Sequence, residues 1–231
     1  MCLKKYFLYY CTLPIHYVQL AAKRLVSYWE KRVEIFGPED AFKPLTLQTD
    51  GALVEDSVAL GIGLMRLTGA KDDSGRIILF ADPSRQDKTK YTTKSMAKAV
   101  WYVLHAALED EDAQKHGIVL VVFPHKAKVT QMDRQLIKLL AGSLKDRIPV
   151  RLAGFHICHP PTFFRVIFPI ISLVLGPRLR KRIRIHAGST EKVQEELNAY
   201  GLTRNKLPSE LEGEIVLDHQ AWLEQRRAAG K

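Results

Sequence analysis

An apolar run followed by a basic strip is the feature of this sequence that most restricts its fold. Residues 163–176 are apolar apart from Arg165 and Ser172, and five basic residues stand among the seven positions of 178–184. As a helix the run would extend about 21 Å at ~1.5 Å per residue, which is shorter than the ~30 Å hydrocarbon core of a bilayer. Arg165 and the internal Pro169 also disfavour a membrane span. We therefore expect a strongly apolar helix that belongs to a folded domain.

The composition of the chain favours one globular domain with additional segments. The 231 residues suffice for a good-sized core, and 46% hydrophobic with 26% charged residues is typical of a folded protein. The formal net charge of +10 indicates an anionic partner: nucleic acid, an anionic membrane surface or a phosphorylated ligand. The cysteines, Cys2, Cys11 and Cys158, form no disulfide framework, so we expect a reducing, cytoplasmic location.

The first 25 residues leave three interpretations open. Two lysines precede an apolar stretch, as in a weak secretory signal, but Tyr9, Tyr10, Thr12 and other polar residues dilute its apolar core. The alternatives are a packed helical leader and the start of a truncated gene model.

Two helical patterns precede the first expected strand. In residues 18–36 apolar side chains recur at spacings of three and four, and Gly37-Pro38 ends the pattern. The residues after it, as far as Gly51, are typical of a linker. Residues 52–67 form the second helical pattern, which two glycines weaken. The apolar face expected for the first helix comprises Val18, Ala22, Leu25, Trp29, Val33 and Phe36.

Short apolar runs then alternate with helical patterns. This alternation predicts an α/β fold with a mostly parallel, mixed sheet flanked by helices. The final strand alternates basic and apolar residues, so we expect it at an edge of the sheet or beneath a polar ligand. The expected buried strands are 76–82, 117–124, 150–158 and 182–188, and the expected helices are 92–114, 130–146, a segment between Ser189 and Gly201, and a short C-terminal segment.

Signatures of nucleotide binding and catalysis are missing from the sequence. It contains no phosphate-binding loop, G-x-S-x-G, H-E-x-x-H or C-x-x-C, and its GIGLMR segment lacks the third glycine of a dinucleotide fingerprint. His156, Cys158 and His159 cannot converge from one strand without a turn. We interpret them as a buried histidine and a strand-end turn rather than a metal site. We therefore expect no catalytic residues, no cofactor and no metal.

The basic strip is compatible with nucleic acid or with lipid. The neighbouring aromatic residues, Phe163, Phe164 and Phe168, lie within the apolar run beside isoleucine and valine. Such surroundings suit lipid better than stacked bases. We expect no nucleic-acid partner and a peripheral association with an anionic membrane surface.

Four segments, taken in order, resemble the CRAL-TRIO lipid-binding domain family. They are DDSGRIILFAD, IPVRLAGFHICHPPTFF, FRVIFPIISLVLGPRLRKRIRIH and LPSELEG, and the resemblance extends from about Lys71 to Ile215. The sequence departs from the family pattern in four places. These are His159 where asparagine is usual, Glu212 where glycine is usual, Phe123-Pro124 where a strand usually ends in aspartate, and Val150 where a phosphatidylinositol carrier of the family has an acidic residue.

The resemblance implies a hydrophobic cavity that has the sheet as its floor and the apolar helix as a movable gate. Arg151, Arg178 and Arg182 match basic positions that contact lipid phosphates in one carrier of the family. The gate and lipid-binding residues implied are Phe163, Phe164, Ile167, Phe168, Ile170, Ile171, Val174 and Leu175.

We interpret the chain as a non-catalytic, monomeric carrier that moves a phospholipid, phosphoinositide or other small lipophile between membranes. Residues 1–50 would form an N-terminal helical segment and linker, 51–217 the lipid-binding domain, and 218–231 a short C-terminal helix. Two alternatives stay open. One is a basic module that recruits membranes or proteins without transferring lipid, and the other is an uncharacterised α/β hydrolase or transferase.

Overall fold

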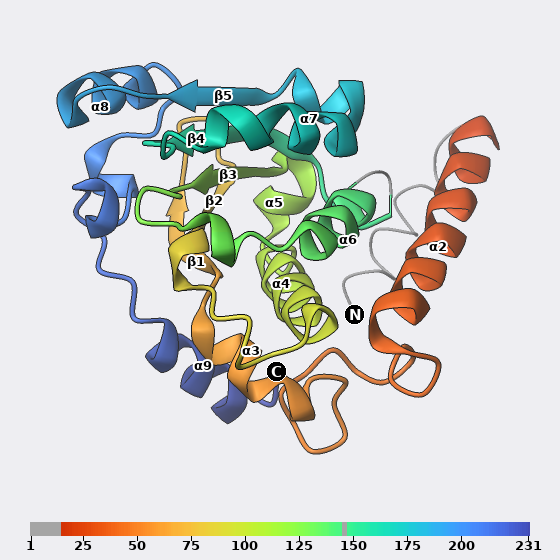
Figure 1. Ribbon diagram of the computed structural model, residues 1–231. Helices are drawn as coiled ribbons and strands as arrows, with labels where there is room; N and C mark the ends of the chain where they lie inside the picture. The colour runs from red at the N-terminus through yellow and green to blue at the C-terminus, as the bar shows by residue number, and fades with distance from the viewer. Residues whose placement is uncertain (1–14, 145–146) are drawn as a thin grey trace.

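The computed structural model describes residues 15–144 and 147–231, and a five-stranded sheet lies at their centre (Figure 1). β1 runs antiparallel to β2, and all other neighbouring strands are parallel. The α/β fold with a mostly parallel, mixed sheet is thus confirmed, and β5 lies at an edge as expected. The strand order is β1 (Met65–Lys71), β2 (Ile77–Ala81), β3 (Ile118–Val122), β4 (Leu152–Cys158) and β5 (Ile183–His186).

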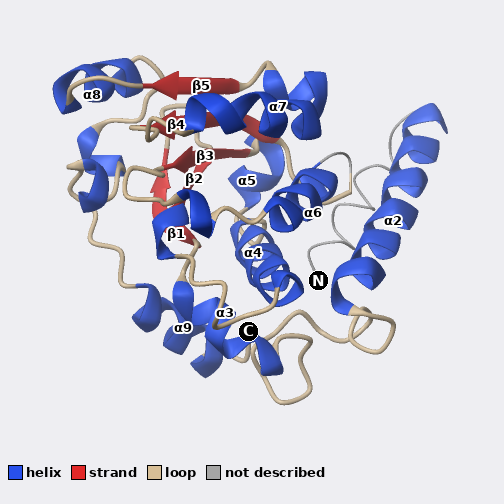
Figure 2. Cartoon of the chain, viewed as in Figure 1, coloured by secondary structure: helices blue, strands red, loops and turns tan. Residues whose placement is uncertain are grey.

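Helices cover both faces of this sheet (Figure 2). Side chains of α4 (Thr93–Ala107), α6 (Arg134–Leu144) and α7 (Phe164–Arg180) pack on one face, which we call the cavity face. Side chains of α8 (Thr190–Asn198) and the segment after it pack on the opposite face, which we call the far face. The other helices are α2 (Ile15–Phe36), α3 (Ser57–Ile62), α5 (Glu111–His116) and α9 (His219–Ala228).

The register of the strands aligns apolar side chains in rows across the sheet. Leu79 pairs with Leu120, which pairs with Phe155, and this row lies on the cavity face. Ile78 and Val119 form the neighbouring pair on the far face. Both faces of β2 and β3 are therefore apolar, as is typical of parallel strands covered by helices on both sides.

The helix expected over residues 52–67 is wrong in its second half. Gly63 adopts the left-handed conformation, with φ of 64°, and ends α3. The residues after it form β1, whose pairing with β2 overrides their local helical spacing. The helix expected over 92–114 is also interrupted, because Asp110 caps a separate α5 by accepting the backbone N–H groups of Asp112 and Ala113.

The face that α2 buries agrees with the expected one only in part. Phe36 is buried and Trp29 and Val33 pack against the core. Ala22, however, is exposed, whereas Tyr28 and Ile35 are at most 1% exposed. The Tyr28 hydroxyl lies 3.1 Å from Nε2 of His105, and Arg32 donates to the same hydroxyl at 3.3 Å. This hydrogen-bonded contact with α4 turns a partly polar face of α2 inward, which the spacing of apolar residues alone does not predict.

The helices of the described residues and the N-terminal segment bear on how the chain relates to membranes. Among the described residues, no helix combines the length and apolar character required to cross a bilayer. The signal, leader and truncation interpretations of the N-terminus concern mainly residues 1–14, which lie outside the described residues.

Candidate functional site

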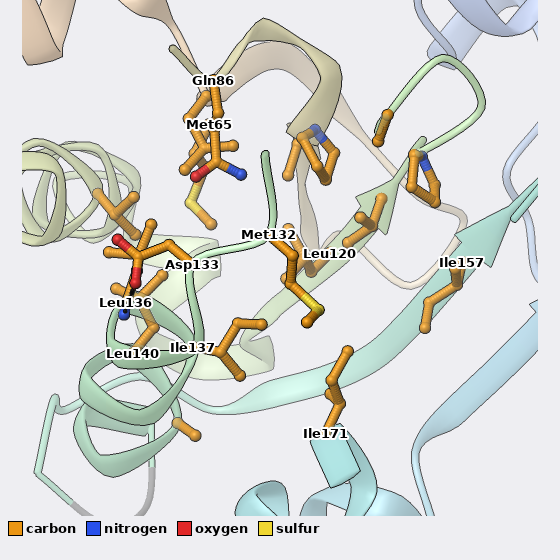
Figure 3. A pocket seen from close by; sticks show the side chains of 18 of the residues that line it. Met65, Gln86, Leu120, Met132, Asp133, Leu136, Ile137, Leu140, Ile157 and Ile171 are labelled. Carbon is orange, nitrogen blue, oxygen red and sulfur yellow. Dashed lines mark hydrogen bonds between the residues drawn. The ribbon is translucent and has the colours of Figure 1, made fainter. Parts of the chain in front are cut away.

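A cavity of about 220 Å³ lies between the cavity face of the sheet and helices α4, α6 and α7 (Figure 3). Its floor is the row of Leu79, Leu120 and Phe155, and Val122 and Ile157 extend the floor towards the carboxyl ends of the strands. These residues alternate with the far-face residues along each strand, because successive side chains of a strand point to opposite faces. The floor is therefore entirely apolar.

Helix α6 forms one wall of the cavity. Leu136, Ile137 and Leu140 line it at helical spacing, and Figure 3 shows them on the same wall. Asp133 fixes the start of the helix, because its Oδ1 accepts the N–H of Leu136 at 2.9 Å. Sequence reasoning predicted this helix but did not assign its apolar residues to the ligand cavity. The helical spacing of apolar residues that begins at Leu136 could have identified this wall.

Helix α7 closes the cavity on another side. The structure brings five of the eight implied gate residues to the cavity: Phe163, Phe164, Ile167, Ile171 and Leu175. From Phe164 to Leu175 they recur every three or four residues, so a single face of the helix lines the cavity, and Phe163 lies just before the first residue of the helix. The other three implied residues lie elsewhere on the helix. Phe168 contacts the ring of Phe164 with centroids 5.4 Å apart, Val174 packs against the main core, and Ile170 is 49% exposed.

The outer face of α7 is also apolar. Val166 and Leu173 are 75% and 76% exposed, and Arg165 is exposed beside them. Pro169 lies inside the helix and cannot donate a backbone hydrogen bond to the preceding turn. Gly176 breaks the helix, with φ of 75° and ψ of 171°, just before its last turn. Apolar side chains on two faces of one helix can therefore contact the cavity and the solvent side at once.

Two of the three arginines implied as headgroup ligands lie at the amino ends of β4 and β5, and the third, Arg178, lies in the last turn of α7. Arg151 directly precedes β4, and Arg182 directly precedes β5 and donates to the Leu152 carbonyl. Burial lowers the pKa of Arg182, and the positive charges of Arg178 and Arg151 lower it further. Arg178 and Arg151 therefore both lie within electrostatic reach of Arg182.

His156 of β4 and His186 of β5 lie on the far face. His156 is 3% exposed and its Nδ1 lies 3.0 Å from Nε2 of His186, while Nδ1 of His186 lies 2.8 Å from the Glu196 carboxylate. Burial, followed by the neighbouring His186, lowers the pKa of His156 to about 4. His159 occupies the turn after β4 with φ of 50°. In the described part of the chain, no group of three or more histidine, cysteine, aspartate or glutamate side chains is placed to hold a metal ion.

Comparison with known proteins decides the family. The family model described as the CRAL/TRIO domain matches residues 63–213. The chain belongs to the CRAL/TRIO domain family. The resemblance drawn from the four sequence segments is therefore confirmed.

Two curated relatives and one solved structure agree with this assignment. Clavesin-2 of Rattus norvegicus is 26% identical over 84% of this chain and 56% of its own length. The alpha-tocopherol transfer protein-like protein of Mus musculus is 27% identical over 71% of this chain and 47% of its own length. The chain thus spans about half the length of these relatives. The crystal structure of Sfh5 matches with a TM-score of 0.55 at 12% identity, covering 93% of this chain and 82% of that one, which supports the shared fold.

Proposed function

We propose that this CRAL/TRIO domain is a non-catalytic carrier that binds a hydrophobic ligand in the cavity and exchanges it at anionic membrane surfaces. The observation that carries the proposal is an apolar cavity closed by a helix whose outer face is also apolar. Exposed apolar patches of this kind mark interaction sites, and α7 carries basic residues near its end as membrane-surface helices do. The printed name of one relative, an alpha-tocopherol transfer protein-like protein, is consistent with such a role.

The free energies involved favour exchange over permanent binding. Burying each CH₂ group of a ligand is worth about 0.8 kcal/mol relative to water. A bilayer provides nearly the same burial, so transfer between bilayer and cavity is close to neutral. The exchange rate then depends on how readily α7 moves. We propose that α7 is a gate hinged at the Pro160-Pro161 step, which precedes the helix, and at Gly176-Pro177, where the helix is interrupted.

We propose that Arg151, Arg178 and Arg182 hold the phosphate of an anionic membrane lipid while the gate is open. Each basic side chain near an anionic surface contributes about 1 kcal/mol to membrane binding. The variant Arg178→Glu with Arg182→Glu should therefore bind vesicles containing phosphatidylserine at least about tenfold more weakly at low salt. The difference should shrink at high salt, because counterions screen the surface charge.

A charge-matched variant separates this local effect from a change in net charge. Arg204→Glu with Arg227→Glu changes the charge equally, at exposed positions outside the arginine cluster. Equal weakening by both variants would show that net charge alone acts, and unchanged binding of the cluster variant would contradict the headgroup role.

Mass spectrometry of organic extracts from the purified protein tests the cavity itself. We expect a bound lipophile, and we expect vesicle-to-vesicle transfer of a fluorescent lipid. If the protein binds vesicles but contains no lipophile and transfers none, it is a recruitment module and the carrier proposal fails.

A further inference from the structure

The cavity wall is almost wholly apolar, although polar residues stand at one end of it. The floor and the inner faces of α6 and α7 contribute only hydrocarbon side chains. The polar residues belong to two loops, 82–92 after β2 and 123–133 after β3, and Figure 3 shows Gln86 and Asp133 at the end of the cavity away from Ile171. Among the described residues, the polar side chains of the lining are Gln86, Lys128, Gln131 and Asp133. Whether a charged ligand fits depends on what these four already contact.

Gln131 uses its side chain to join the two loops. Its amide nitrogen donates to the carbonyl oxygens of Ser84 at 2.6 Å and of Gln86 at 2.9 Å. Its amide oxygen accepts the backbone N–H of Lys128 at 2.7 Å. All three bonds are made to backbone groups of the protein, so they explain why an amide stands at the end of an apolar cavity. The presence of Gln131 therefore does not call for a polar ligand.

The ionised side chains of the lining are Asp133 and Lys128, within the part of the chain that the structure describes. The carboxylate of Asp133 accepts the N–H of Leu136 at 2.9 Å and the hydroxyl of Thr93 at 2.7 Å, so it caps α6 and holds it to α4. Lys128 is exposed, and its long side chain can keep the ammonium in water. The two charges are opposite, so the lining carries no net charge. No excess of either sign therefore attracts an ionised ligand group.

Arg151, Arg178 and Arg182 do not alter this balance, because none of them lines the cavity. An ionised group that enters an apolar enclosure loses its hydration, and this loss is offset only where an opposite charge and hydrogen bonds meet the group. The hydrocarbon surface of the cavity supplies neither. A neutral hydroxyl or ester loses much less on the same transfer. A phosphate or carboxylate therefore stays at the arginines or in water, while a neutral molecule can enter.

We propose that the cargo is a compact neutral lipophile without an ionised group, such as a long-chain alcohol or ester, and that lipids with charged headgroups contact only the surface of the protein. This inference rests on the proposed carrier function and names the class of its cargo. The cavity of about 220 Å³ is smaller than the ~300–1,000 Å³ that is typical of pockets for small ligands. That volume favours a compact molecule over a phospholipid with two acyl chains.

Four probes with the same alkyl chain test the selection at neutral pH: decanol, methyl decanoate, decanoate and decylamine, of which the last two are ionised. Affinity is measured by displacement of the neutral dye Nile red from the delipidated full chain. Decanol and methyl decanoate should bind at least about tenfold more tightly than either ion, because only the ions lose a hydrated charge on entry. If decanoate or decylamine binds as tightly as decanol, the cavity provides a partner for that charge and the inference is wrong.

Loading from a membrane tests the same selection with membrane lipids. The delipidated chain is incubated with vesicles of phosphatidylcholine and phosphatidylserine that contain hexadecanol as the neutral lipid, then re-isolated and extracted for mass spectrometry. Relative to the vesicles, hexadecanol should be enriched over the phospholipids at least about tenfold. A phospholipid bound in stoichiometric amounts would overturn the inference, while the carrier function would stand.

A charge placed in the wall tests whether the lining causes the selection. Ile137→Lys adds an ammonium to the α6 wall, so it should tighten decanoate binding at least about fivefold and weaken decanol binding. Gln135→Lys is the matched control, since Gln135 is exposed on the same helix and does not line the cavity. An unchanged preference for decanol in a folded Ile137→Lys protein, or equal effects of both variants, would show that the lining does not select. Thermal unfolding verifies folding, and the wild-type series decides the question if Ile137→Lys does not fold.

The outcomes separate this inference from the carrier proposal. If the ions bind as well as the neutral probes, the selection for neutral cargo is wrong while the carrier function stands. If neither the probes nor the vesicle lipids bind and organic extracts of the purified protein contain no lipophile, the carrier proposal fails and this inference fails with it.

Discussion

The two faces of the sheet are packed to different degrees. On the far face Ile78, Phe80 and Val121 are completely buried beneath α8 and the segment after it. On the cavity face Leu79 and Leu120 border an open volume of about 220 Å³, although helices cover this face too. A filled face can hold the strands in register while the hollow face remains available to a ligand. The comparison therefore divides the sheet into a side that stabilises the fold and a side that binds.

This division has an energetic consequence for the covering helices. A helix that packs over a cavity makes fewer close contacts than one that interdigitates with the sheet, because atoms at the cavity wall have no partners on one side. Helix α7 is in this position, with an apolar face towards the cavity and another towards solvent. This difference is why we propose α7, rather than α8 on the filled face, as the gate.

The largest expected effect is a difference in stability between the two faces. Leu207→Ala, at a completely buried far-face position, should lower the free energy of unfolding by about 3–5 kcal/mol. Leu120→Ala should cost about half as much, because one side of that leucine already borders the cavity. Denaturant unfolding measures both variants. Equal losses, or a larger loss at Leu120, would refute the division into a stabilising and a binding face.

The next largest expected effect is a loss of stability at acidic pH, which arises from a buried histidine on the far face. Burial, followed by the neighbouring His186, lowers the pKa of His156 to about 4 from its ordinary 6.5. Arg184 and Arg76 lower this pKa further, and Asp72 raises it. Between about pH 4 and pH 6.5 the imidazole of His156 is therefore protonated in the unfolded chain but neutral in the folded one. The free energy of unfolding should fall by roughly 3 kcal/mol as the pH drops from about 6.5 to about 4.

His105 of α4, on the other side of the sheet, responds in the same direction, because burial lowers its pKa to about 4 as well. His156→Asn should therefore remove about half of the combined loss, while keeping a donor near the position of Nδ1. Urea unfolding of wild type and variant at neutral and acidic pH measures the difference. Exposed His116→Asn is the control. If the free energy of unfolding of the His156 variant depends on pH as that of the wild type does, His156 does not cause the loss of stability at acidic pH.

Sequence patterns predicted the far face better than the cavity. The apolar runs of β2, β3 and β4 identified the buried strands, because a strand covered on both faces needs no other signal. β1 was missed because Leu64, Met65 and Leu67 have helical spacing and only pairing with β2 makes them a strand. Local residue propensities carry no information about which strand will pair with a segment.

The candidate site could be predicted only in part. The apolar run identified α7, but which of its faces lines the cavity depends on packing that one sequence does not fix. The polar residues that line the cavity, Gln86, Lys128, Gln131 and Asp133, were not predicted, because they stand in two loops that are far apart in the sequence.

The smallest expected effect concerns the outer face of α7, where the comparison of faces extends to the membrane. Val166→Asp with Leu173→Asp should leave the free energy of unfolding nearly unchanged, because both side chains are already about three-quarters exposed. If this face enters the bilayer interface, each side chain loses up to ~1.5–3 kcal/mol of burial there, so vesicle affinity should fall about tenfold to a hundredfold. Because the new aspartates also add negative charge, Val58→Asp with Val216→Asp is the control, at exposed positions away from α7.

Sedimentation with neutral phosphatidylcholine vesicles removes the charge effect and isolates the apolar contribution. If both double variants bind neutral and anionic vesicles equally well, α7 does not insert, and the membrane contact must come from the arginine cluster alone.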